Sequence, residues 1–405
     1  MKILLLSTDK FSGAGKAAQK INFALNELNI SCDHKVLFNS KSEFDLKSKI
    51  KKIIYKFKIK IYTFCGIISG KDSNDFQSLS LFPTNLSDEI NKSDYDIINL
   101  TWINELLNIE DIGKIKKPIV WTLCDMWPIA GINHYENYKD DAFWKFKNFN
   151  KFNFKKLSLD KWIIKRKINS WNNNITLVSP SKWLLNCAKE SIVTKHLQIE
   201  NIPWPINRKV FNKKDKIKMR TRHSLPLDKK LILFNSFSGV YSMRKGGDLF
   251  FKSLEKINQD FEVLIIGNYV DRNINQKVNH KIHWIGKIDN DLMLSELISC
   301  ADLLVLPSRI DNLPQTGLEA QACGLPIVAF DTNGVKDLVE HKVDGYLAKP
   351  YDIKSLKDGI EWILNELDSS NELIQNSLRK SEEKWDSIII ANKYQRLYKK
   401  ILNIK

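Results

Sequence analysis

The chain has 405 residues, of which 43% are apolar and 27% are charged, and its formal net charge is +16. This balance excludes an intrinsically disordered chain, and the length exceeds what one hydrophobic core usually serves, so we expect two globular domains. The six cysteines include no C-x-x-C pair, which argues against a disulfide framework or a zinc site. The apolar runs are too short for a secretory signal or a membrane span, so we expect a cytoplasmic protein.

The basic excess is concentrated in the first half of the chain. Residues 1–200 contain 31 Lys and Arg against 21 Asp and Glu, a net charge of +10, which leaves +6 for the remainder. A basic surface suits nucleic acid, anionic lipid or a phosphorylated acceptor. A lysine-rich genome would produce the same excess, so charge alone does not select a partner.

The hydrophobic pattern alternates between strands and helices in both halves. Residues 2–8 form an apolar run that predicts a strand, and residues 14–28 place apolar side chains at helical spacing. Strands that alternate with helices predict an α/β architecture with parallel sheets. The pattern predicts further strands at 31–38, 96–100, 118–123, 175–178, 230–235, 261–267 and 303–307, and a second helix at 247–257.

Prolines mark the boundary between the two halves. Pro203 and Pro205 restrict the backbone, so we expect the hinge near 203–212, with an N-terminal domain over 1–205 and a C-terminal domain over 206–383. Residues 384–405 have the amphipathic pattern of a terminal helix.

A glycine-containing loop follows the first predicted strand. Gly13, Gly15 and Ala18 match the G-x-G-x-x-A fingerprint of dinucleotide-binding proteins, so an NAD-dependent enzyme is one alternative. That fingerprint requires an acid at the carboxyl end of the second strand, whereas Asp33 stands near the beginning of the predicted strand 31–38. The spacing before Lys16 also differs from a phosphate-binding P-loop. We therefore interpret the loop as one that lets the backbone at Gly13 and Gly15 approach the substrates, and we expect both glycines to contact the donor.

The segment 303–346 carries the clearest chemical signal. Its pattern predicts a strand, a loop with Asp311 and a helix that begins near Gln315 and contains Glu319. Both acids then lie at the carboxyl edge of a parallel sheet, where open α/β folds bind ligands. The first turn of the helix offers N–H groups to a phosphate. The alternative is one acid that caps a helix and a second, unrelated surface acid.

This segment resembles the E-x7-E segment of family 4 glycosyltransferases, with Asp311 in place of the first Glu. The resemblance implies that Glu319 holds the ribose hydroxyls of a nucleotide-sugar donor and that Asp311 lies near the transferred sugar. The donor loop between them would contain Asn312, Leu313, Pro314, Gln315 and Thr316. The match also includes Pro307, Ser308, Leu318, Ala320, Ala322, Cys323, Gly324 and Pro326.

Two further segments of the second half are similar to the same family. Arg244 and Lys245 stand in an R-K-G turn after a predicted strand, where two cations would neutralise the departing nucleoside diphosphate. A solvated basic turn is the alternative. The stretch 284–289 contains Gly286 and Ile288 and resembles the loop whose backbone meets the nucleobase.

In the first half, residues 121–135 resemble the W-T-L-H-D-M-W-x-x-T-G-G-C-H-Y stretch of a subgroup that makes bacterial exopolysaccharides and O-antigens, of the colanic-acid type. Cys124 replaces the family's active-site His, beside Asp125. The resemblance places Trp127 and His134 on the acceptor side of the site, although a structural role for His134 is the alternative.

Taken over the chain, the resemblance implies the GT-B fold, in which two Rossmann-like domains face each other and the C-terminal helix returns to the N-terminal domain. It implies a retaining hexosyltransferase that moves a sugar from a nucleotide-sugar donor to a glycan or lipid-linked acceptor in surface polysaccharide biosynthesis, without a metal or other cofactor. Because of Cys124, a catalytically impaired donor-binding partner with the same fold stays open as the alternative.

A basic aromatic segment spans Phe143–Lys167. It interleaves seven Phe and Trp residues with nine Lys and Arg residues, which suits an anionic membrane surface. A packed pair of helices with a solvated face and single-stranded nucleic acid are the alternatives, of which nucleic acid is the least favoured. The run 47–60 has a weaker pattern of the same kind. These segments predict a peripheral position at the inner face of the cytoplasmic membrane.

Overall fold

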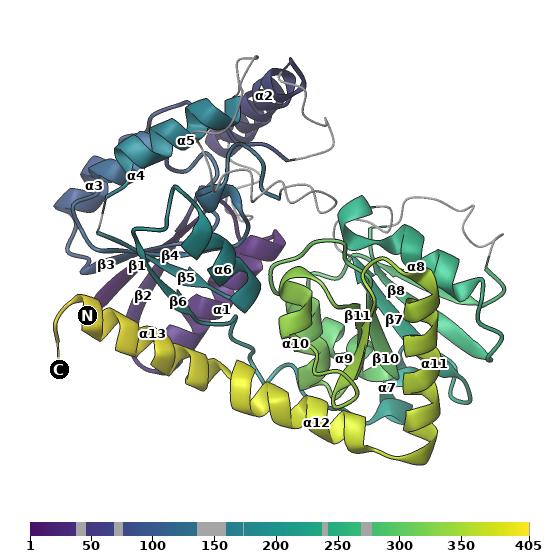
Figure 1. The fold of residues 1–405 in the computed structure, drawn as a ribbon. Coiled ribbons are helices and arrows are strands. Elements are labelled where there is room, and N and C mark those ends of the chain that lie inside the picture. Colours follow the sequence, from purple (N-terminus) through teal and green to yellow (C-terminus); the bar gives the residue numbers. More distant parts are fainter. Residues whose placement is uncertain are drawn as a thin grey trace. The chain divides into compact units, whose positions relative to one another are not determined.

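The computed structural model describes residues 1–37, 46–68, 76–135, 159–172, 174–236, 242–268 and 278–404. The chain divides into two compact units. The first unit comprises Met1–Pro203 and Ala391–Lys405, and the second comprises Trp204–Ile390. Each unit contains one six-stranded sheet with helices packed against it (Figure 1).

The sheet of the first unit has the strand order β2-β1-β3-β4-β5-β6, and all of its pairs are parallel. The inner strands β3 and β4 are buried along their whole length, as expected for strands that helices cover on both faces. The strand order reverses between β1 and β3. The strands are β1 Lys2–Ser7, β2 Ser31–Val36, β3 Ile97–Leu100, β4 Ile119–Thr122, β5 Ile175–Ser179 and β6 Gln198–Asn201.

The helices of the first unit begin at polar capping residues in several places. The Ser12 hydroxyl accepts a hydrogen bond from the backbone N–H of Gly15, and Ser181 caps Leu184 in the same way. The helices are α1 Gly13–Glu27, α2 Leu46–Ile68, α3 Leu86–Lys92, α4 Ile109–Lys114, α5 Leu159–Ser170 and α6 Lys182–Glu190, with a 3₁₀ turn η2 at Trp127–Ile129.

The sheet of the second unit has the order β12-β11-β10-β7-β8-β9, again with parallel pairs, and it reverses between β7 and β10. Its strands are β7 Lys230–Ser236, β8 Phe261–Gly267, β9 Ile282–Gly286, β10 Leu303–Leu306, β11 Ile327–Phe330 and β12 Gly345–Ala348. Its helices are α7 Lys216–Arg222, α8 Gly247–Leu254, α9 Asp291–Cys300, α10 Gln315–Ala322, α11 Ile353–Ser369 and α12 Glu372–Lys380, with 3₁₀ turns η4 Met243–Lys245 and η6 Asn333–Asp337.

The C-terminal helix α13 spans Ser387–Ile401, and its residues from Ala391 belong to the first unit. Two buried tyrosines attach it there: Asn99 Nδ2 donates to the Tyr398 hydroxyl at 2.6 Å, and the hydroxyls of Thr122 and Tyr394 lie 3.0 Å apart. Burial raises the pKa of both tyrosines, so their hydroxyls stay protonated. The helix begins three residues later than predicted, because Ser381–Trp385 form a π-helical turn.

The two parallel sheets confirm the predicted α/β fold class. Most element ends lie within two residues of the prediction, including the strand predicted over 31–38, which ends at Val36. The helix predicted over 247–257 ends three residues early, at Leu254. Among the described helices, none has the length and apolar character needed to cross a membrane.

Candidate functional site

In the second unit, the candidate residues lie where the strand order reverses. The turn η4 follows β7, and the loop with Asp311 follows β10, which is the neighbour of β7 in the sheet. Open α/β sheets bind ligands outside the carboxyl ends of strands at such a switch point. The topology therefore brings Arg244, Lys245 and Asp311 to the edge that suits a ligand.

These three residues form one charged cluster. Lys245 Nζ lies 2.5 Å from one carboxylate oxygen of Asp311, and Arg244 Nη1 lies 3.2 Å from the other. Burial alone would raise the pKa of Asp311, but the two cations hold this pKa below its ordinary value. Burial lowers the pKa of Lys245, and Asp311 opposes that effect. The cluster thus concentrates cationic donors around a single anion.

A close backbone contact holds the turn against the strand end. Gly246 has a φ of +69°, and a Cβ on it would lie 1.8 Å from the carbonyl oxygen of Pro307, so another residue cannot stand there without a shift. The backbone N–H of Arg309 donates to the carbonyl of Arg244 at 2.8 Å. Arg309 also forms a bidentate ion pair with Asp248, in which Nη1 and Nη2 each lie 2.6 Å from a carboxylate oxygen.

Asn333 supports the same loop from the segment after β11. Its Oδ1 accepts from the backbone N–H of Asp311 at 3.0 Å, and its Nδ2 donates to the carbonyl of Arg309 at 2.8 Å. Sequence reasoning missed both Arg309 and Asn333. Arg309 could have been identified from its position two residues before Asp311, whereas nothing in the sequence spacing indicates Asn333.

The helix α10 begins at Gln315, as the sequence predicted, and Pro314 precedes it. Glu319 is buried within α10, and a Cβ on Gly317 would lie 2.1 Å from Leu338, so the helix packs closely at its first turn. Asn312 and Leu313 are buried, whereas Gln315 and Thr316 are partly exposed. The first turn carries backbone N–H groups of the kind that bind phosphate.

The stretch predicted to meet a nucleobase lies further along the same sheet edge. Gly286 ends β9 with a φ of +81°, and Ile288 follows it, partly exposed. Since β9 stands two positions from β7 in the sheet, its end is about 10 Å away by strand spacing.

In the first unit, the glycine loop is packed against its own chain. A Cβ on Gly15 would lie 2.4 Å from the carbonyl oxygen of Asp9, whereas one on Gly13 would meet nothing within 4 Å. The Asp9 carboxylate accepts from the N–H groups of Phe11 and Ser12 at 2.7 Å each. Gly15 therefore has a structural reason to be glycine, and contact of either glycine with a substrate stays a prediction.

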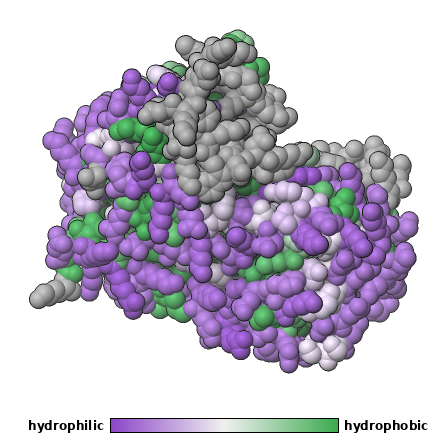
Figure 2. All heavy atoms as spheres, in the orientation of Figure 1, coloured by the Kyte–Doolittle hydropathy of each residue, from purple (hydrophilic) through white to green (hydrophobic). Residues whose placement is uncertain are grey.

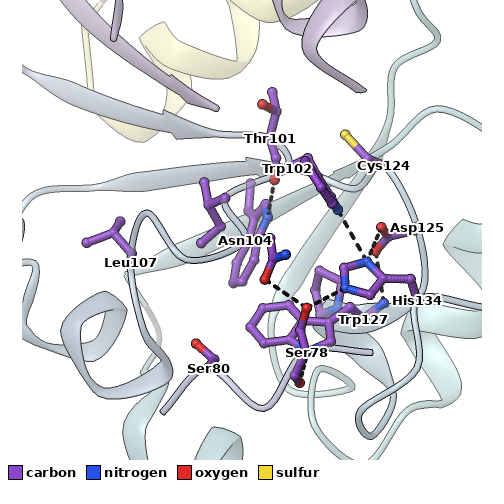
Figure 3. A pocket seen from close by; sticks show the side chains of 13 residues that line it. Ser78, Ser80, Thr101, Trp102, Asn104, Leu107, Cys124, Asp125, Trp127 and His134 are labelled. Carbon is purple, nitrogen blue, oxygen red and sulfur yellow. Dashed lines mark hydrogen bonds and ion pairs between the residues drawn. The ribbon is translucent and has the colours of Figure 1, made fainter. Parts of the chain in front are cut away.

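A pocket lies where β3 and β4 of the first unit end (Figure 3). Its lining combines aromatic side chains with buried polar groups, and the predicted residues Cys124, Asp125, Trp127 and His134 all belong to it. The lining also includes Ser78, Ser80, Thr101, Trp102, Asn104 and Leu107, which the sequence did not single out.

His134 is the centre of a hydrogen-bond network in this pocket. Its Nδ1 lies 2.6 Å from the Asp125 carboxylate, and its Nε2 lies 2.7 Å from the Ser78 hydroxyl. Ser78 donates to Asn104 Oδ1 at 2.8 Å, so His134 Nε2 must be the donor toward Ser78. The Trp102 indole N–H also donates to His134 Nδ1, at 3.2 Å. The network fixes the orientation of the imidazole.

The remaining pocket residues surround this network. The Trp127 indole donates to the carbonyl of Ser78 at 2.9 Å and stacks on His134 with ring centres 6.2 Å apart. The Cys124 thiol makes a weak contact with the Thr122 carbonyl at 3.9 Å, and in Figure 3 its sulfur points away from His134. Burial, with the neighbouring Asp125, raises the pKa of the Cys124 thiol well above its usual range, so the thiol stays neutral.

The basic aromatic segment is described only in part. Residues 143–158 lie outside the described residues, and 159–167 belong to α5, where Ile163, Ile164 and Lys167 are buried. Lys167 donates to the carbonyls of Trp127, Ala130 and Gly131, so this lysine, predicted to face a membrane, instead stabilises the pocket loop. Its fixed position reflects three backbone acceptors that the sequence pattern did not reveal.

Across the described parts of the chain, no group of three or more His, Cys, Asp or Glu residues is placed to hold a metal ion.

Comparisons with known proteins agree with this architecture. Residues 215–380, which lie within the second unit, match the family model described as Glycosyl transferases group 1. A sucrose-phosphate synthase from Thermosynechococcus elongatus has the same fold over 100% of this chain and 99% of its own, with a TM-score of 0.68 and 16% identity. Anabaena HepE, solved with UDP and glucose, covers 98% of this chain and 99% of its own, with a TM-score of 0.63 and 14% identity.

Two curated relatives share part of the sequence. The N-acetyl-alpha-D-glucosaminyl L-malate synthase of Bacillus anthracis is 23% identical over 56% of this chain and 60% of the relative. The N,N'-diacetylbacillosaminyl-diphospho-undecaprenol alpha-1,3-N-acetylgalactosaminyltransferase of Campylobacter jejuni is 26% identical over 44% of this chain and 47% of the relative. The chain thus spans about half the length of the curated relatives it matches.

Proposed function

We propose that this protein is a retaining glycosyltransferase that transfers a hexose-type sugar from a nucleotide-sugar donor to a glycan or lipid-linked acceptor in surface polysaccharide biosynthesis. The observation that carries the proposal is the Arg244, Lys245 and Asp311 cluster at the switch point of a unit that matches group 1 glycosyl transferases. The proposal includes a cytoplasmic location at the membrane periphery and no requirement for a metal or other cofactor.

In this proposal the second unit binds the donor. Arg244 and Lys245 pair with the diphosphate, the first turn of α10 donates backbone N–H groups to it, and Glu319 binds the ribose. Fixed cations also stabilise the charge that develops as the nucleoside diphosphate departs, without reorganisation during the reaction. The presence of UDP in the HepE structure supports a uridine nucleotide as the first donor to test.

The pocket of the first unit serves the acceptor in this proposal. Aromatic faces beside hydrogen-bonding groups suit a sugar ring, which has apolar faces and a hydroxyl rim. His134, oriented by Asp125 and Ser78, supplies a fixed polar group there.

The second candidate function is a donor-binding partner that has lost transfer activity. The observation that favours it is Cys124, since a neutral thiol donates and accepts hydrogen bonds weakly where the family resemblance implies an imidazole. The two candidates share donor binding and differ only in turnover.

A thermal-shift screen of nucleoside diphosphates tests donor binding first. A ligand at 100 times its dissociation constant stabilises the folded state by about 2.7 kcal/mol, which such a screen detects. The diphosphate that stabilises the protein identifies the donor, whose sugar release into water or onto an acceptor is then followed by NMR of the anomeric proton. Retained configuration supports the proposal, donor binding without turnover supports the inactive partner, and failure of every nucleotide to bind contradicts both.

A further inference from the structure

The helix α2 directs its apolar side chains away from the protein. Seven Ile and Phe residues of this helix are 47–71% exposed. Their spacing follows the i, i+3, i+4, i+7 rule, so they share one side of the helix. In most surface helices that side faces the core. The seven residues, here called the outer face of α2, are Ile50, Ile53, Ile54, Phe57, Phe64, Ile67 and Ile68.

The opposite side of α2 fixes the helix in this orientation. Tyr62 is fully buried and donates to Glu105 at 2.6 Å, and Lys58 lies 3.2 Å from the other oxygen of that carboxylate. Asn104 Nδ2 donates to the Tyr55 hydroxyl at 3.2 Å. A rotation that hid the outer face would leave Glu105 buried without these partners, which is costly. The exposure of the apolar side chains is therefore built into the packing.

The charge of α2 indicates what covers the outer face. The helix Leu46–Ile68 contains seven lysines and no acidic residue, and Lys49, Lys56 and Lys60 are exposed. Protein interfaces are depleted of lysine, whereas an apolar face flanked by lysines is typical of helices that lie in the surface of an anionic bilayer. Figure 2 shows apolar surface at the top of the view, where Figure 1 places α2.

We propose that α2 docks the first unit on an anionic phospholipid bilayer. The outer face enters the boundary between headgroups and acyl chains, and the lysines contact the phosphates. The helix shares Asn104 with the pocket of His134, so docking brings that pocket to the membrane surface. This inference rests on the membrane-peripheral location included in the proposed function, and it names the surface responsible. Vesicle binding is measured without sugar transfer, so the two can fail separately.

Co-sedimentation of the full chain with vesicles tests the proposal. We expect binding to phosphatidylcholine vesicles that contain about one third phosphatidylglycerol, and binding about tenfold weaker to phosphatidylcholine alone. The triple variant Ile53→Asn, Phe57→Asn and Phe64→Asn should bind the anionic vesicles about tenfold more weakly than the natural protein. Lys49→Glu with Lys56→Glu and Lys60→Glu should remove the preference for anionic lipid.

A matched control uses exposed apolar residues of the second unit. Ile217, Leu227 and Leu292 are 68%, 57% and 54% exposed, close to the 64–66% of the three test residues. Their triple change to Asn should leave vesicle binding within about twofold of the natural protein. Nucleotide affinity, measured on every variant, reports folding and separates failure of this inference from failure of the proposed function.

Three results would overturn the proposal. One is a natural protein that does not sediment with anionic vesicles at low salt. Another is a test triple that binds vesicles as well as the control triple does. The third is a natural protein that is dimeric without lipid and becomes monomeric in the test triple without any change in vesicle binding, because the outer face would then be an interface between copies of this chain.

Discussion

The charged cluster of the second unit and the pocket of the first unit suit ligands of different chemistry. In the second unit, Arg244 and Lys245 each lie within 3.2 Å of the Asp311 carboxylate at the switch point of the sheet. In the first unit, neutral and aromatic groups surround the His134 network. Fixed cations suit a diphosphate, whereas an oriented network with aromatic walls suits hydroxyl groups. Variants of the second unit should therefore change mainly donor affinity, and variants of the first unit should change mainly the turnover number of sugar transfer.

The largest expected effect concerns the two cations of the second unit. Arg244→Ala with Lys245→Ala should weaken nucleoside diphosphate binding about 100-fold. Each charge-assisted contact contributes about 1.5–3 kcal/mol, but in the natural protein the phosphates compete with Asp311 for the two cations, which reduces their net contribution. Nucleoside binding should change less than about threefold, because the nucleoside lacks phosphate. Titration calorimetry with both ligands measures the two affinities.

The control for this prediction removes the same charge elsewhere in the unit. Lys218 and Arg222 are exposed on α7, and their change to Ala should leave both affinities unaltered. Equal losses for diphosphate and nucleoside would remove the two cations from the phosphate site.

The second prediction tests the network of the first unit. His134→Gln should lower the turnover number of sugar transfer about 30-fold, because the imidazole that joins Asp125 and Ser78 is lost and general acid–base or positioning groups contribute effects of this size or larger. Donor affinity should stay within about twofold, since the proposed contacts to the diphosphate and the ribose lie in the other unit. Ser78→Ala should have a smaller effect in the same direction.

Steady-state kinetics with saturating donor measure the turnover. If His134→Gln weakens nucleotide binding as much as it lowers turnover, the contrast between the two units fails and His134 is a structural residue.

The third prediction returns to the second unit. Glu319→Ala should weaken nucleotide binding about tenfold without unfolding the protein, because charge-assisted bonds to the ribose hydroxyls are lost. The nucleotide affinity of Glu319→Gln, which keeps one acceptor oxygen, should lie between that of the natural protein and that of Glu319→Ala. Affinity for the nucleoside should fall with that for the diphosphate, in contrast to the cation variants, and an unchanged nucleoside affinity would place Glu319 outside the ribose site.

In the second unit, the sequence signals for the candidate site are local. Strand β10, the loop with Asp311 and the start of α10 follow one another within 303–322, so periodicity and helix-start rules apply directly. The pairing of β7 with β10 joins strands that are far apart in the sequence, but the rules of parallel α/β topology allow few strand orders. Arg309 and Asn333 support the loop through tertiary hydrogen bonds that leave no periodic trace.

The pocket of the first unit depends on contacts that leave no local pattern in the sequence. Ser78 and Asp125 contact His134 from separate segments, and Asn104 joins the network through Ser78. No spacing rule in the sequence predicts that such polar residues come together. In the sequence, the basic pattern of 47–60 is weaker than that of 143–167. Exposure of the side chains, which only the fold determines, distinguishes α2 from α5. Buried Lys167 illustrates the difference, since a lysine in a basic run was expected at the surface.

The smallest expected effect concerns Cys124, which follows β4 in the pocket wall. A cysteine at this position is the clearest departure from the glycosyltransferase pattern that the segment resembles. Cys124→Ala should keep donor binding within about threefold, a change below about 0.7 kcal/mol, because a neutral, weakly hydrogen-bonded thiol contributes little to a ligand held by the other unit. Transfer should change more than binding, since the loss alters the wall beside Asp125. Calorimetry and turnover measured on one preparation compare the two. Cys124→His is the decisive companion: if it creates transfer where the natural protein shows none with any donor, the chain is the inactive partner, and if it lowers an existing activity, the pocket has been rebuilt around a thiol.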